Sequence, residues 1–557
     1  MTSAAEAARA WAAIDPDEAT RAEVQHLLDL GDDAGLADRF GARLRFGTAG
    51  LRGALGAGPN RMNRVVVAQT SAGLARFLLG RTDAPTAVVG YDARHNSAIF
   101  ARDAAQVLAA AGIAVTLLPR AMPTPVLAFA VRDLGVDAGV MITASHNPAA
   151  DNGYKLYLGG PDEGSQLVPP ADEQVLAAID QVVAGGVLPP RSDQVTVAGG
   201  DLVERYIAAA AGVARAAGAA PSDSGTGDDP AAPPLRWVYT PMHGVGLATM
   251  LAVAATAGLP TPEIVPQQAQ PDPDFPTVAF PNPEEPGALD LALARAAEVD
   301  ADLLIANDPD ADRLAVAVPE QAGWRRLTGN EVGLLLAWST ASRAASAGGA
   351  AGVLATSVVS TPGLAAIAEH FALPSAETLT GFKWISRVPG LVFGFEEALG
   401  YLVNPGSIRD KDGLSAAVAV LAEAIALRAR GRTLTDRLLE IDAAIGHFAS
   451  DQVSIRALDP AAIERTMAAL RATPPTRLGG LAVLGIDDLA AGGPLPPTDG
   501  LRLHLEQEAR VVIRPSGTEP KVKAYLDLVI RGDPDPHVGA AARLRTLAAD
   551  VRRLLAG

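Results

Sequence analysis

Short apolar runs alternate with helix-like segments through most of this chain, and this alternation restricts the fold more than any other feature. Runs 86–90, 113–118 and 138–142 have the length and apolar character of buried strands, whereas 65–79 and 99–111 carry apolar residues at helical spacing. Strands that alternate with helices favour a mostly parallel sheet with helices packed on it. The same rhythm recurs twice further along, so the sequence predicts three α/β units.

The chain changes character near residue 446. Runs 501–503, 511–513 and 522–528 are rich in strand-forming residues. We therefore expect a strand-rich α+β unit at the C-terminal end. The tract 218–234 is rich in Pro, Gly, Ser and Asp, which is typical of a flexible surface insertion.

The composition excludes several classes of partner. The 557-residue chain has a formal net charge of −17, which disfavours nucleic acid, and contains no cysteine. No uncharged run is long enough to cross a bilayer, and Glu6, Arg9 and Asp15 interrupt the segment where a signal peptide would lie. We expect a cytoplasmic protein without a nucleic-acid or membrane partner. An anionic substrate would have to be bound by local cations.

The segment Thr143–Pro148, with the sequence TASHNP, follows the predicted strand 138–142. Open α/β sheets place their chemistry at such strand ends. The segment offers a hydroxyl, an imidazole and an amide, and Ser145 is the candidate nucleophile. The alternative is that Ser145 only caps the loop, as serine often does.

A second polar segment, NDPDADR, follows the apolar run 303–306. Its carboxylates at Asp308, Asp310 and Asp312 could converge on one hard cation such as Mg²⁺, with a position left open for a phosphate oxygen. An EF-hand begins with the same spacing, but its sixth position here is Arg313 instead of glycine. The remaining alternative is a solvated acidic turn.

Three further segments could bind anions or hydroxyl groups. The glycine-rich stretch 43–58 and the segment 514–521, RPSGTEPK, combine arginine with backbone N–H groups that can approach a phosphate. The segment 394–401, GFEEALGY, places adjacent carboxylates after a strand, where they could accept hydrogen bonds from sugar hydroxyls. Nearby cations come from 380–384 and 409–413. Each segment could also be an ordinary turn, paired surface loop or helix start.

Together and in this order, these segments resemble the α-D-phosphohexomutase family of phosphoglucomutases and phosphomannomutases. TASHNP resembles the family's phosphoserine loop, DPDADR its metal loop, the glutamate segment its sugar loop and RPSGTEP its phosphate loop. The flanking segments 46–53, 240–246 and 280–285 are similar to the branch that contains phosphoglucomutase-2 and phosphopentomutase-type enzymes. The resemblance covers nearly the whole chain except the tract 218–234.

The resemblance implies an α/β protein of four domains around a central cleft, with three related mixed α/β domains and a smaller α+β domain. The expected domains are 1–204 with the N-terminal helices and phosphoserine loop, 205–325 with the metal loop, 326–445 with the sugar loop and 446–557 with the phosphate loop.

The implied activity is reversible phosphoryl transfer between the 1- and 6-positions of a hexose phosphate, through a phosphoserine enzyme and a sugar 1,6-bisphosphate. Glucose phosphates are the expected substrates and mannose phosphates are further candidates. The alternatives are a phosphopentomutase acting on ribose or deoxyribose phosphates and a glucose-1,6-bisphosphate synthase. Glucose 1,6-bisphosphate would serve as activator, and the protein would be a monomer or weak homodimer.

The resemblance also assigns roles to individual residues. Ser145 would carry the phosphoryl group and, with the three aspartates, hold one Mg²⁺ per chain. Arg52 and Lys155 would flank the transferring group; moving a proton would require burial and nearby cations to lower the pKa of Lys155. His146 is expected to steady the loop. It is disfavoured as the base, because adjacent side chains on an extended strand point to opposite faces and His146 should then point away from Ser145. The expected substrate-binding residues are Arg313, Thr380, Lys383, Glu396, Glu397, Arg514, Ser516, Gly517 and Thr518.

Some positions depart from the family pattern. Ala398 stands where many relatives have serine, Tyr401 where some have histidine, and Phe382 where the bacterial dual-specificity branch has histidine. The substrate preference is therefore the least constrained part of the hypothesis. A serine hydrolase is disfavoured because Ser145 lacks the glycines of a nucleophile elbow. A phosphatase would instead release free phosphate.

Overall fold

The computed structural model describes residues 3–45, 50–216, 234–321, 323–346, 352–456, 460–516, 521–532 and 536–556. The chain forms two compact units. The first contains residues 1–326 and 404–422, and the second contains residues 327–403 and 423–557. None of the described helices is both long enough and apolar enough to span a membrane.

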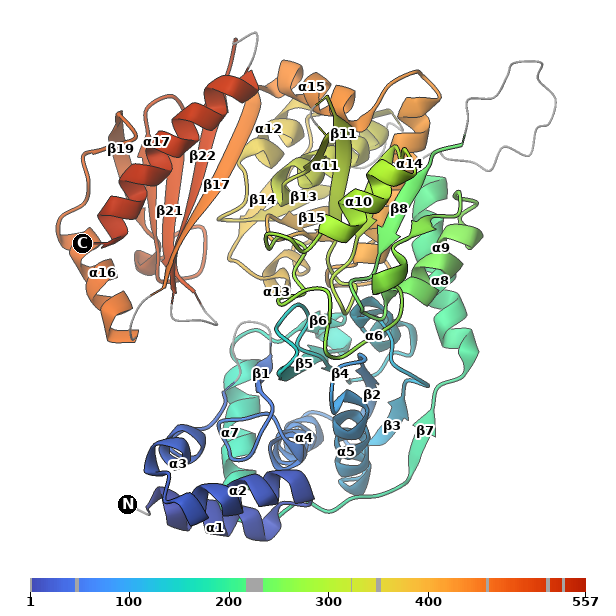
Figure 1. The fold of residues 1–557 in the computed structure, drawn as a ribbon, viewed down its shortest axis with the longest axis vertical. Coiled ribbons are helices and arrows are strands. Elements are labelled where there is room, and N and C mark those ends of the chain that lie inside the picture. The colour runs from blue at the N-terminus through green and yellow to red at the C-terminus, as the bar shows by residue number, and fades with distance from the viewer. Residues whose placement is uncertain are drawn as a thin grey trace. The chain divides into compact units, whose positions relative to one another are not determined.

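The first unit contains a seven-stranded mixed sheet (Figure 1). Its spatial order is β1 (Leu51–Ala54), β5 (Asp151–Leu158), β4 (Ala138–Ile142), β2 (Thr86–Tyr91), β3 (Ala114–Leu117) and β7 (Val195–Val197), with β6 (Ser165–Gln166) paired to β5. Strands β4, β2, β3 and β7 run parallel. Tyr91 and Ile142 are paired at the ends of β2 and β4, so the loops that follow both strands start at the same edge.

Helices cover this sheet because their apolar faces need a partner. They are α4 (Arg64–Leu79), α5 (Ser97–Ala110), α6 (Thr124–Asp133) and α7 (Ala171–Ala184), with the short η1 (Gly160–Asp162). Helix α4 packs between α5 and α7, while α6 contacts β2 and β4. A Cβ atom on Gly73 would lie 2.7 Å from the Cα of Ile179, so glycine permits the close approach of α4 and α7.

Three N-terminal helices precede the sheet. They are α1 (Ala4–Ile14), α2 (Glu18–Leu30) and α3 (Asp33–Phe40). Helix α2 ends at Gly31, which has a φ of 63°, and Asp32 caps α3 by accepting a hydrogen bond from the Gly35 N–H. The three helices bury Trp11, Val24 and other apolar side chains in a small core of their own.

The first unit also contains a five-stranded sheet. Its order is β12 (Gly323–Arg326), β11 (Ala315–Glu320), β10 (Leu303–Ala306), β8 (Trp237–Thr240) and β9 (Glu263–Ile264). The associated helices are α8 (Gly200–Ala216), α9 (Gly246–Thr256), α10 (Asp290–Glu298) and the short η2 (Pro266–Gln268). Strands β10 and β8 are parallel, buried neighbours. Residues 404–422, which include the start of α14 (Gly413–Arg428), return to this unit.

The second unit begins with a four-stranded sheet. Its order is β14 (Ser375–Thr378), β13 (Val353–Ser357), β15 (Leu391–Glu396) and β16 (Gly400–Leu402). The helices of this part are α11 (Gly329–Ser346), α12 (Gly363–His370), α13 (Phe382–Ile385) and α15 (Leu434–Ile445). Strands β14, β13 and β15 are parallel, and β16 is antiparallel to β15.

The C-terminal part of the second unit is an antiparallel sheet of six strands. Its order is β17 (His447–Arg456), β22 (Lys521–Ile530), β21 (Arg510–Pro515), β20 (Leu501–Leu505), β19 (Leu481–Asp488) and β18 (Arg477–Leu478). The accompanying helices are α16 (Pro460–Ala472), α17 (Pro536–Ala556) and the short η3 (Leu489–Ala491). Helix α17 packs along β17 and β22 (Figure 1).

The fold confirms the predicted class. Three mixed sheets with their helices are followed by a strand-rich α+β part, and β4 has the predicted limits. The four domain boundaries stay predictions. The predicted insertion lies, from residue 218 to 233, outside the described residues.

Candidate active site

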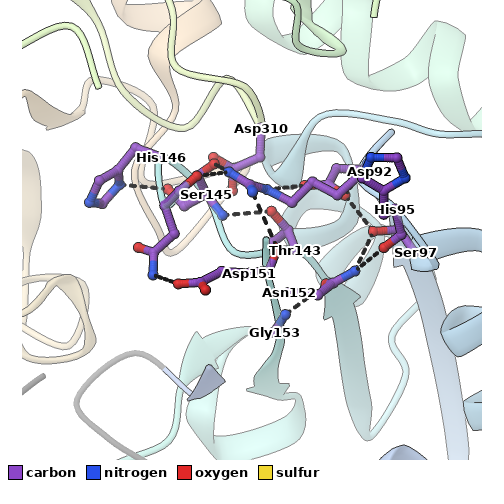
Figure 2. A network of polar contacts seen from close by, with 12 residues as sticks. Asp92, His95, Ser97, Thr143, Ser145, His146, Asp151, Asn152, Gly153 and Asp310 are labelled. Carbon is purple, nitrogen blue, oxygen red and sulfur yellow. Dashed lines mark hydrogen bonds and ion pairs between the residues drawn. The ribbon is translucent and has the colours of Figure 1, made fainter. Parts of the chain in front are cut away.

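Ser145 lies in a tight loop directly after β4. Its φ is 54°, so the strand has ended before this residue. The Ser145 N–H donates to the Thr143 hydroxyl at 2.8 Å, and the Asn147 N–H donates to the Ala144 carbonyl at 3.0 Å. Only 2% of Ser145 is exposed. The loop therefore holds its hydroxyl in a fixed, buried position (Figure 2).

The buried guanidinium of Arg94 supports this loop from the loop that follows the neighbouring strand β2. Its Nη2 donates at 2.6 Å to the carbonyl oxygens of both Ser145 and Asn147, and its Nη1 donates at 2.9 Å to that of Pro148. The Arg94 Nε lies 3.4 Å from a carboxylate oxygen of Asp92. Burial lowers the pKa of Arg94, and the nearby carboxylates oppose this effect. Sequence reasoning did not identify this residue.

The three predicted metal-binding aspartates lie in the loop after β10 and are fully buried. The Ala311 N–H donates to the Asp308 carbonyl at 2.8 Å, and Ala311 has a φ of 56°. The aspartate loop packs closely against Gly244. A Cβ atom at that position would lie only 2.3 Å from the Cα of Pro309, so glycine permits the close approach. One oxygen from each aspartate lies within 4.8 Å of the other two.

The structure brings the serine and aspartate loops together within the first unit. The Ser145 hydroxyl donates to Asp308 Oδ2 at 2.9 Å, and its Oγ lies 3.1 Å from His146 Nδ1. The expectation that His146 points away from Ser145 is wrong. The left-handed φ of Ser145 breaks the alternation of an extended strand, so both side chains lie on the same side. Burial, followed by nearby cations, lowers the pKa of His146 well below its usual value.

Lys155 extends from β5 to the same carboxylates. Its Nζ lies 2.7 Å from Asp310 Oδ2 and 2.8 Å from Asp312 Oδ2. Burial lowers the pKa of Lys155, but the two carboxylates outweigh burial and raise the pKa above its usual value. This direction is opposite to the lowered pKa that a proton-accepting role would require.

The carboxylate cluster fits a divalent cation. Asp310 Oδ1 and Asp312 Oδ1 are buried and have no hydrogen-bond partner, although buried carboxylate oxygens normally have one. Burial and the charges of its two neighbours raise the pKa of Asp308 well above the usual range. A hard cation would supply the missing partner and relieve the repulsion between the carboxylates.

Two arginines add positive charge next to Ser145. Arg52 Nη1 donates to Asn147 Oδ1 at 2.9 Å, and burial together with Arg313 lowers the pKa of Arg52. The backbone N–H of Arg313 donates to Asp308 Oδ1 at 3.0 Å. The Arg313 Nε is buried without a hydrogen-bond partner.

Several supporting residues were not predicted as site residues. The Thr124 hydroxyl donates to Asp310 Oδ2 at 2.6 Å. Lys411 Nζ lies 3.3 Å from Asp312 Oδ2, which follows from the return of residues 404–422 to the first unit. The hydroxyl of Tyr157 and the amide of Gln166 donate to Asp410 at 2.8 and 2.6 Å. The predicted cations of 409–413 thus belong to a buried network, not a surface loop.

The predicted sugar-loop residues lie in the second unit. Glu396 Oε1 accepts a hydrogen bond of 2.6 Å from the Gly381 N–H, which joins the end of β15 to the segment with Thr380 and Lys383. Glu397 Oε2 accepts a hydrogen bond of 2.8 Å from the Ser360 hydroxyl. The Lys383 Nζ lies 5.9 Å from the centre of the Trp384 ring.

Tyr401, the last residue of the predicted sugar-loop segment, has a hydrogen-bond partner within the protein. Tyr401, which departs from the family pattern, is fully buried, and its hydroxyl donates to the Gly329 carbonyl at 3.2 Å.

In the predicted phosphate loop, Arg514 lies near the end of β21, and the Ser516 N–H donates to the Lys521 carbonyl at 2.8 Å. Gly517 and Thr518 lie outside the described residues.

Comparison with known families matches three models in order. The phosphoglucomutase/phosphomannomutase α/β/α domain I model matches residues 43–184, domain II matches 225–323 and domain III matches 328–442. The chain belongs to the phosphoglucomutase/phosphomannomutase family. As a family member it is an isomerase, an intramolecular phosphotransferase that acts on sugar phosphates.

Individual relatives of the family cover nearly the whole chain. A Haemophilus influenzae protein named "probable phosphomannomutase" is 49% identical over 84% of this chain and 93% of its own length. The human phosphopentomutase is 34% identical over 94% of this chain and 92% of its own. A Staphylococcus epidermidis phosphoglucomutase is 33% identical over 87% of this chain and 90% of its own.

A solved structure shows the same fold. The open form of parafusin, a phosphoglucomutase from Paramecium, superposes with a TM-score of 0.69 at 16% identity, covering 92% of this chain and 96% of its own.

Proposed function

We propose that this protein interconverts the 1- and 6-phosphates of a hexose by carrying a phosphoryl group on Ser145. The observation that supports this most strongly is the 2.9 Å contact between the Ser145 hydroxyl and Asp308, within a buried cluster of three carboxylates. Phosphoryl transfer depends mostly on positioning and on charge neutralisation, and this site provides both. The resting active enzyme would carry phosphoserine at this position.

The reaction consists of two half-reactions. In the first, the bond between Ser145 Oγ and phosphorus breaks and a bond from phosphorus to a sugar hydroxyl oxygen forms, which gives a sugar 1,6-bisphosphate. In the second, Oγ attacks the other phosphoryl group and the isomeric sugar monophosphate leaves. The sugar hydroxyl loses a proton in the first half-reaction, and the released sugar oxygen gains one in the second, so protons balance.

Two side chains are candidates for handling these protons. His146 Nδ1, 3.1 Å from Oγ, is our candidate to accept the Oγ proton when Oγ attacks, a role that suits the lowered pKa of this imidazole. Lys155 is our candidate for proton exchange with the sugar oxygens, because a metal ion held by Asp310 and Asp312 would weaken their contacts with its amine.

Asp308, Asp310 and Asp312 would hold one Mg²⁺, with Ser145 beside it. When bound, this ion would neutralise charge on the phosphoryl oxygens as a Lewis acid. Arg52 would add positive charge at the same place.

We assign recognition of the sugar to the second unit. Glu396 and Glu397 would accept hydrogen bonds from sugar hydroxyls with the help of Thr380 and Lys383. Arg514 and Ser516, with Gly517 and Thr518, would hold the phosphate that is not reacting. Arg313, in the metal loop of the first unit, is a further candidate for substrate binding. Glucose 1,6-bisphosphate would restore phosphoserine in enzyme that has lost it.

The choice of a hexose follows from the relatives. The 49% identical relative is named for mannose phosphate, and another relative is named for glucose phosphate. The second candidate is a pentose phosphate, because the human phosphopentomutase matches 94% of this chain. A third candidate, glucose-1,6-bisphosphate synthesis, would use the same phosphoserine.

A coupled assay with glucose 1-phosphate, mannose 1-phosphate and ribose 1-phosphate, each with its bisphosphate, tests the proposal. We expect kcat/KM to be at least about tenfold higher for a hexose phosphate than for ribose 1-phosphate, the lower end of the effect of one missing carbon group in a fitted site. A higher value for ribose 1-phosphate would make the protein a phosphopentomutase. Release of free phosphate without isomerised sugar would make it a phosphatase.

A further inference from the structure

Three metal-ligating side chains converge in the second unit, on elements separate from the residues proposed to bind substrate. Asp442 lies in the last turn of α15, His447 is the first residue of β17 and His537 lies in the first turn of α17. His447 Nδ1 lies 2.9 Å from Asp442 Oδ2, and His537 Nε2 lies 3.4 Å from the same oxygen. The two imidazole rings are 4.2 Å apart at their centres.

The backbone explains why these residues meet. Helix α15 ends at Gly446, which has a φ of 91° and donates its N–H to the Asp442 carbonyl at 2.8 Å. This turn places His447 beside Asp442. His447 is also paired with Ile530 at the end of β22, and α17, which begins at Pro536, packs along both strands.

The spacing of the ligand atoms suits one metal ion. The two nitrogens and the carboxylate oxygen all lie within 4.8 Å of one another. An ion with four tetrahedral bonds of about 2.0–2.1 Å separates its ligand atoms by roughly 3.3 Å, close to the two distances above. The side chains of Asp442 and His447 are 15% and 11% exposed, whereas that of His537 is 43% exposed, so solvent can reach the cluster from one side.

The ligand chemistry differs from that of the aspartate cluster. Three carboxylates favour a hard cation such as Mg²⁺. Two imidazole nitrogens and one carboxylate instead favour zinc or a similar transition metal. The two clusters should therefore select different ions from the same solution.

We propose that Asp442, His447 and His537 form a second metal site, which binds Zn²⁺ or a related transition-metal ion with water completing the coordination. A bound ion would tie the end of α15 to the starts of β17 and α17. Its role is structural, and it is independent of the proposed sugar-phosphate chemistry.

Calorimetric titration of the full-length protein with Zn²⁺ in excess Mg²⁺ tests this site. We expect one strong Zn²⁺ site in the wild type, and at least about tenfold weaker binding in His447→Gln, His537→Gln and Asp442→Asn. Zn²⁺ should also raise the Tm of the wild type and change that of His537→Gln much less, because a ligand stabilises only the state that binds it. Unchanged mutase activity of His537→Gln with Mg²⁺ would show that this variant is folded.

Two control variants make the result specific. His504 and Asp487 form a more exposed pair, with 2.8 Å between Nε2 and Oδ2, so His504→Gln should bind Zn²⁺ like the wild type. Asp310→Asn should also keep the strong Zn²⁺ site. Equal Zn²⁺ affinity in His537→Gln, His447→Gln and the wild type would overturn the proposal, as would the absence of strong binding to the wild type.

Discussion

Arg94 Nη2 donates a 2.6 Å hydrogen bond to the carbonyl oxygen of Ser145. The same guanidinium donates to the carbonyl oxygens of Asn147, Pro148 and, at 3.3 Å, Asp151. One buried side chain therefore fixes the backbone at the proposed nucleophile and along the segment that follows it. This arrangement makes Arg94 a positioning residue for the Ser145 loop.

Replacing Arg94 with lysine should lower kcat about 10- to 100-fold and change KM by less, because misplacement by about 1 Å can cost a factor of 100. A single ammonium group cannot reproduce the planar fork that spans these carbonyls. Steady-state kinetics of Arg94→Lys beside Arg120→Lys, an exposed arginine of the same unit, would measure the effect. Wild-type kcat in Arg94→Lys would exclude the positioning role.

Replacing Ser145 with alanine should abolish mutase turnover, because the variant has no hydroxyl to carry the phosphoryl group. Intact-mass measurement of active wild-type protein should show about 80 Da of added mass, which the variant lacks. Thr143→Ala is the matched loop variant, because it removes the hydroxyl that accepts the Ser145 N–H and leaves the nucleophile in place. Mutase turnover that persists in Ser145→Ala would rule out a phosphoserine mechanism.

Removal of the metal should stop turnover. In a variant that binds the metal more weakly, a higher Mg²⁺ concentration should restore activity. Asp312→Asn removes one charge from the cluster and should raise the Mg²⁺ concentration needed for half-maximal activity at least about tenfold. Activity titrations after chelation would measure this shift, with the exposed Asp300→Asn as control. If chelated enzyme kept full activity, the three aspartates would have a purely structural role.

Lys155 should stabilise the metal-free protein more than the metal-bound protein. Its ammonium group is the cation closest to Asp310 and Asp312, and removal of one partner from a buried ion pair typically costs about 3–5 kcal/mol. Lys155→Met should therefore lower the free energy of unfolding strongly without metal, and Mg²⁺ should recover part of the loss.

Denaturant unfolding with and without Mg²⁺ would measure this difference. Lys523→Met, on β22 of the second unit, provides the comparison for loss of a lysine elsewhere. An equal loss of stability with and without Mg²⁺ would show that Lys155 and the metal do not compete for the carboxylates.

The sequence was sufficient where local patterns determine the structure. Strand β4 has its predicted limits because every one of its residues is apolar or small and buried, and the polar loop after it marks its end. The three aspartates were predicted to converge because they lie within five residues of one another, and they do.

The features of the site that the sequence does not predict depend on contacts between distant segments or on a single backbone angle. Arg94 binds carbonyl groups 51–57 residues away. Since every residue has a backbone carbonyl, the sequence does not indicate which of them a side chain binds. Lys411 reaches Asp312 only because residues 404–422 return to the first unit. The orientation of His146 was predicted wrongly because the positive φ of Ser145 cannot be read from the strand that precedes it.

Gly329 should be essential to the geometry of the sugar loop, although it lies far from that loop in sequence. A Cβ atom at this position would lie 1.8 Å from the Glu397 carbonyl oxygen, and backbone cannot move away as a flexible side chain can. Gly329→Ala should therefore displace the segment that carries Glu396 and Glu397. We expect a loss of about 1–3 kcal/mol in the free energy of unfolding, together with a raised KM for the sugar phosphate.

The comparison variant for this test is Gly485→Ala. A Cβ atom on Gly485, on strand β19, has no neighbour within 4 Å, so this change should leave KM unaltered. Denaturant unfolding and steady-state kinetics on both variants would separate a local displacement from a general effect of replacing glycine. If Gly329→Ala had the stability and KM of the wild type, close packing against the Glu397 backbone would not be what sets the sugar loop, and the proposed role of the adjacent carboxylates would lose its structural support.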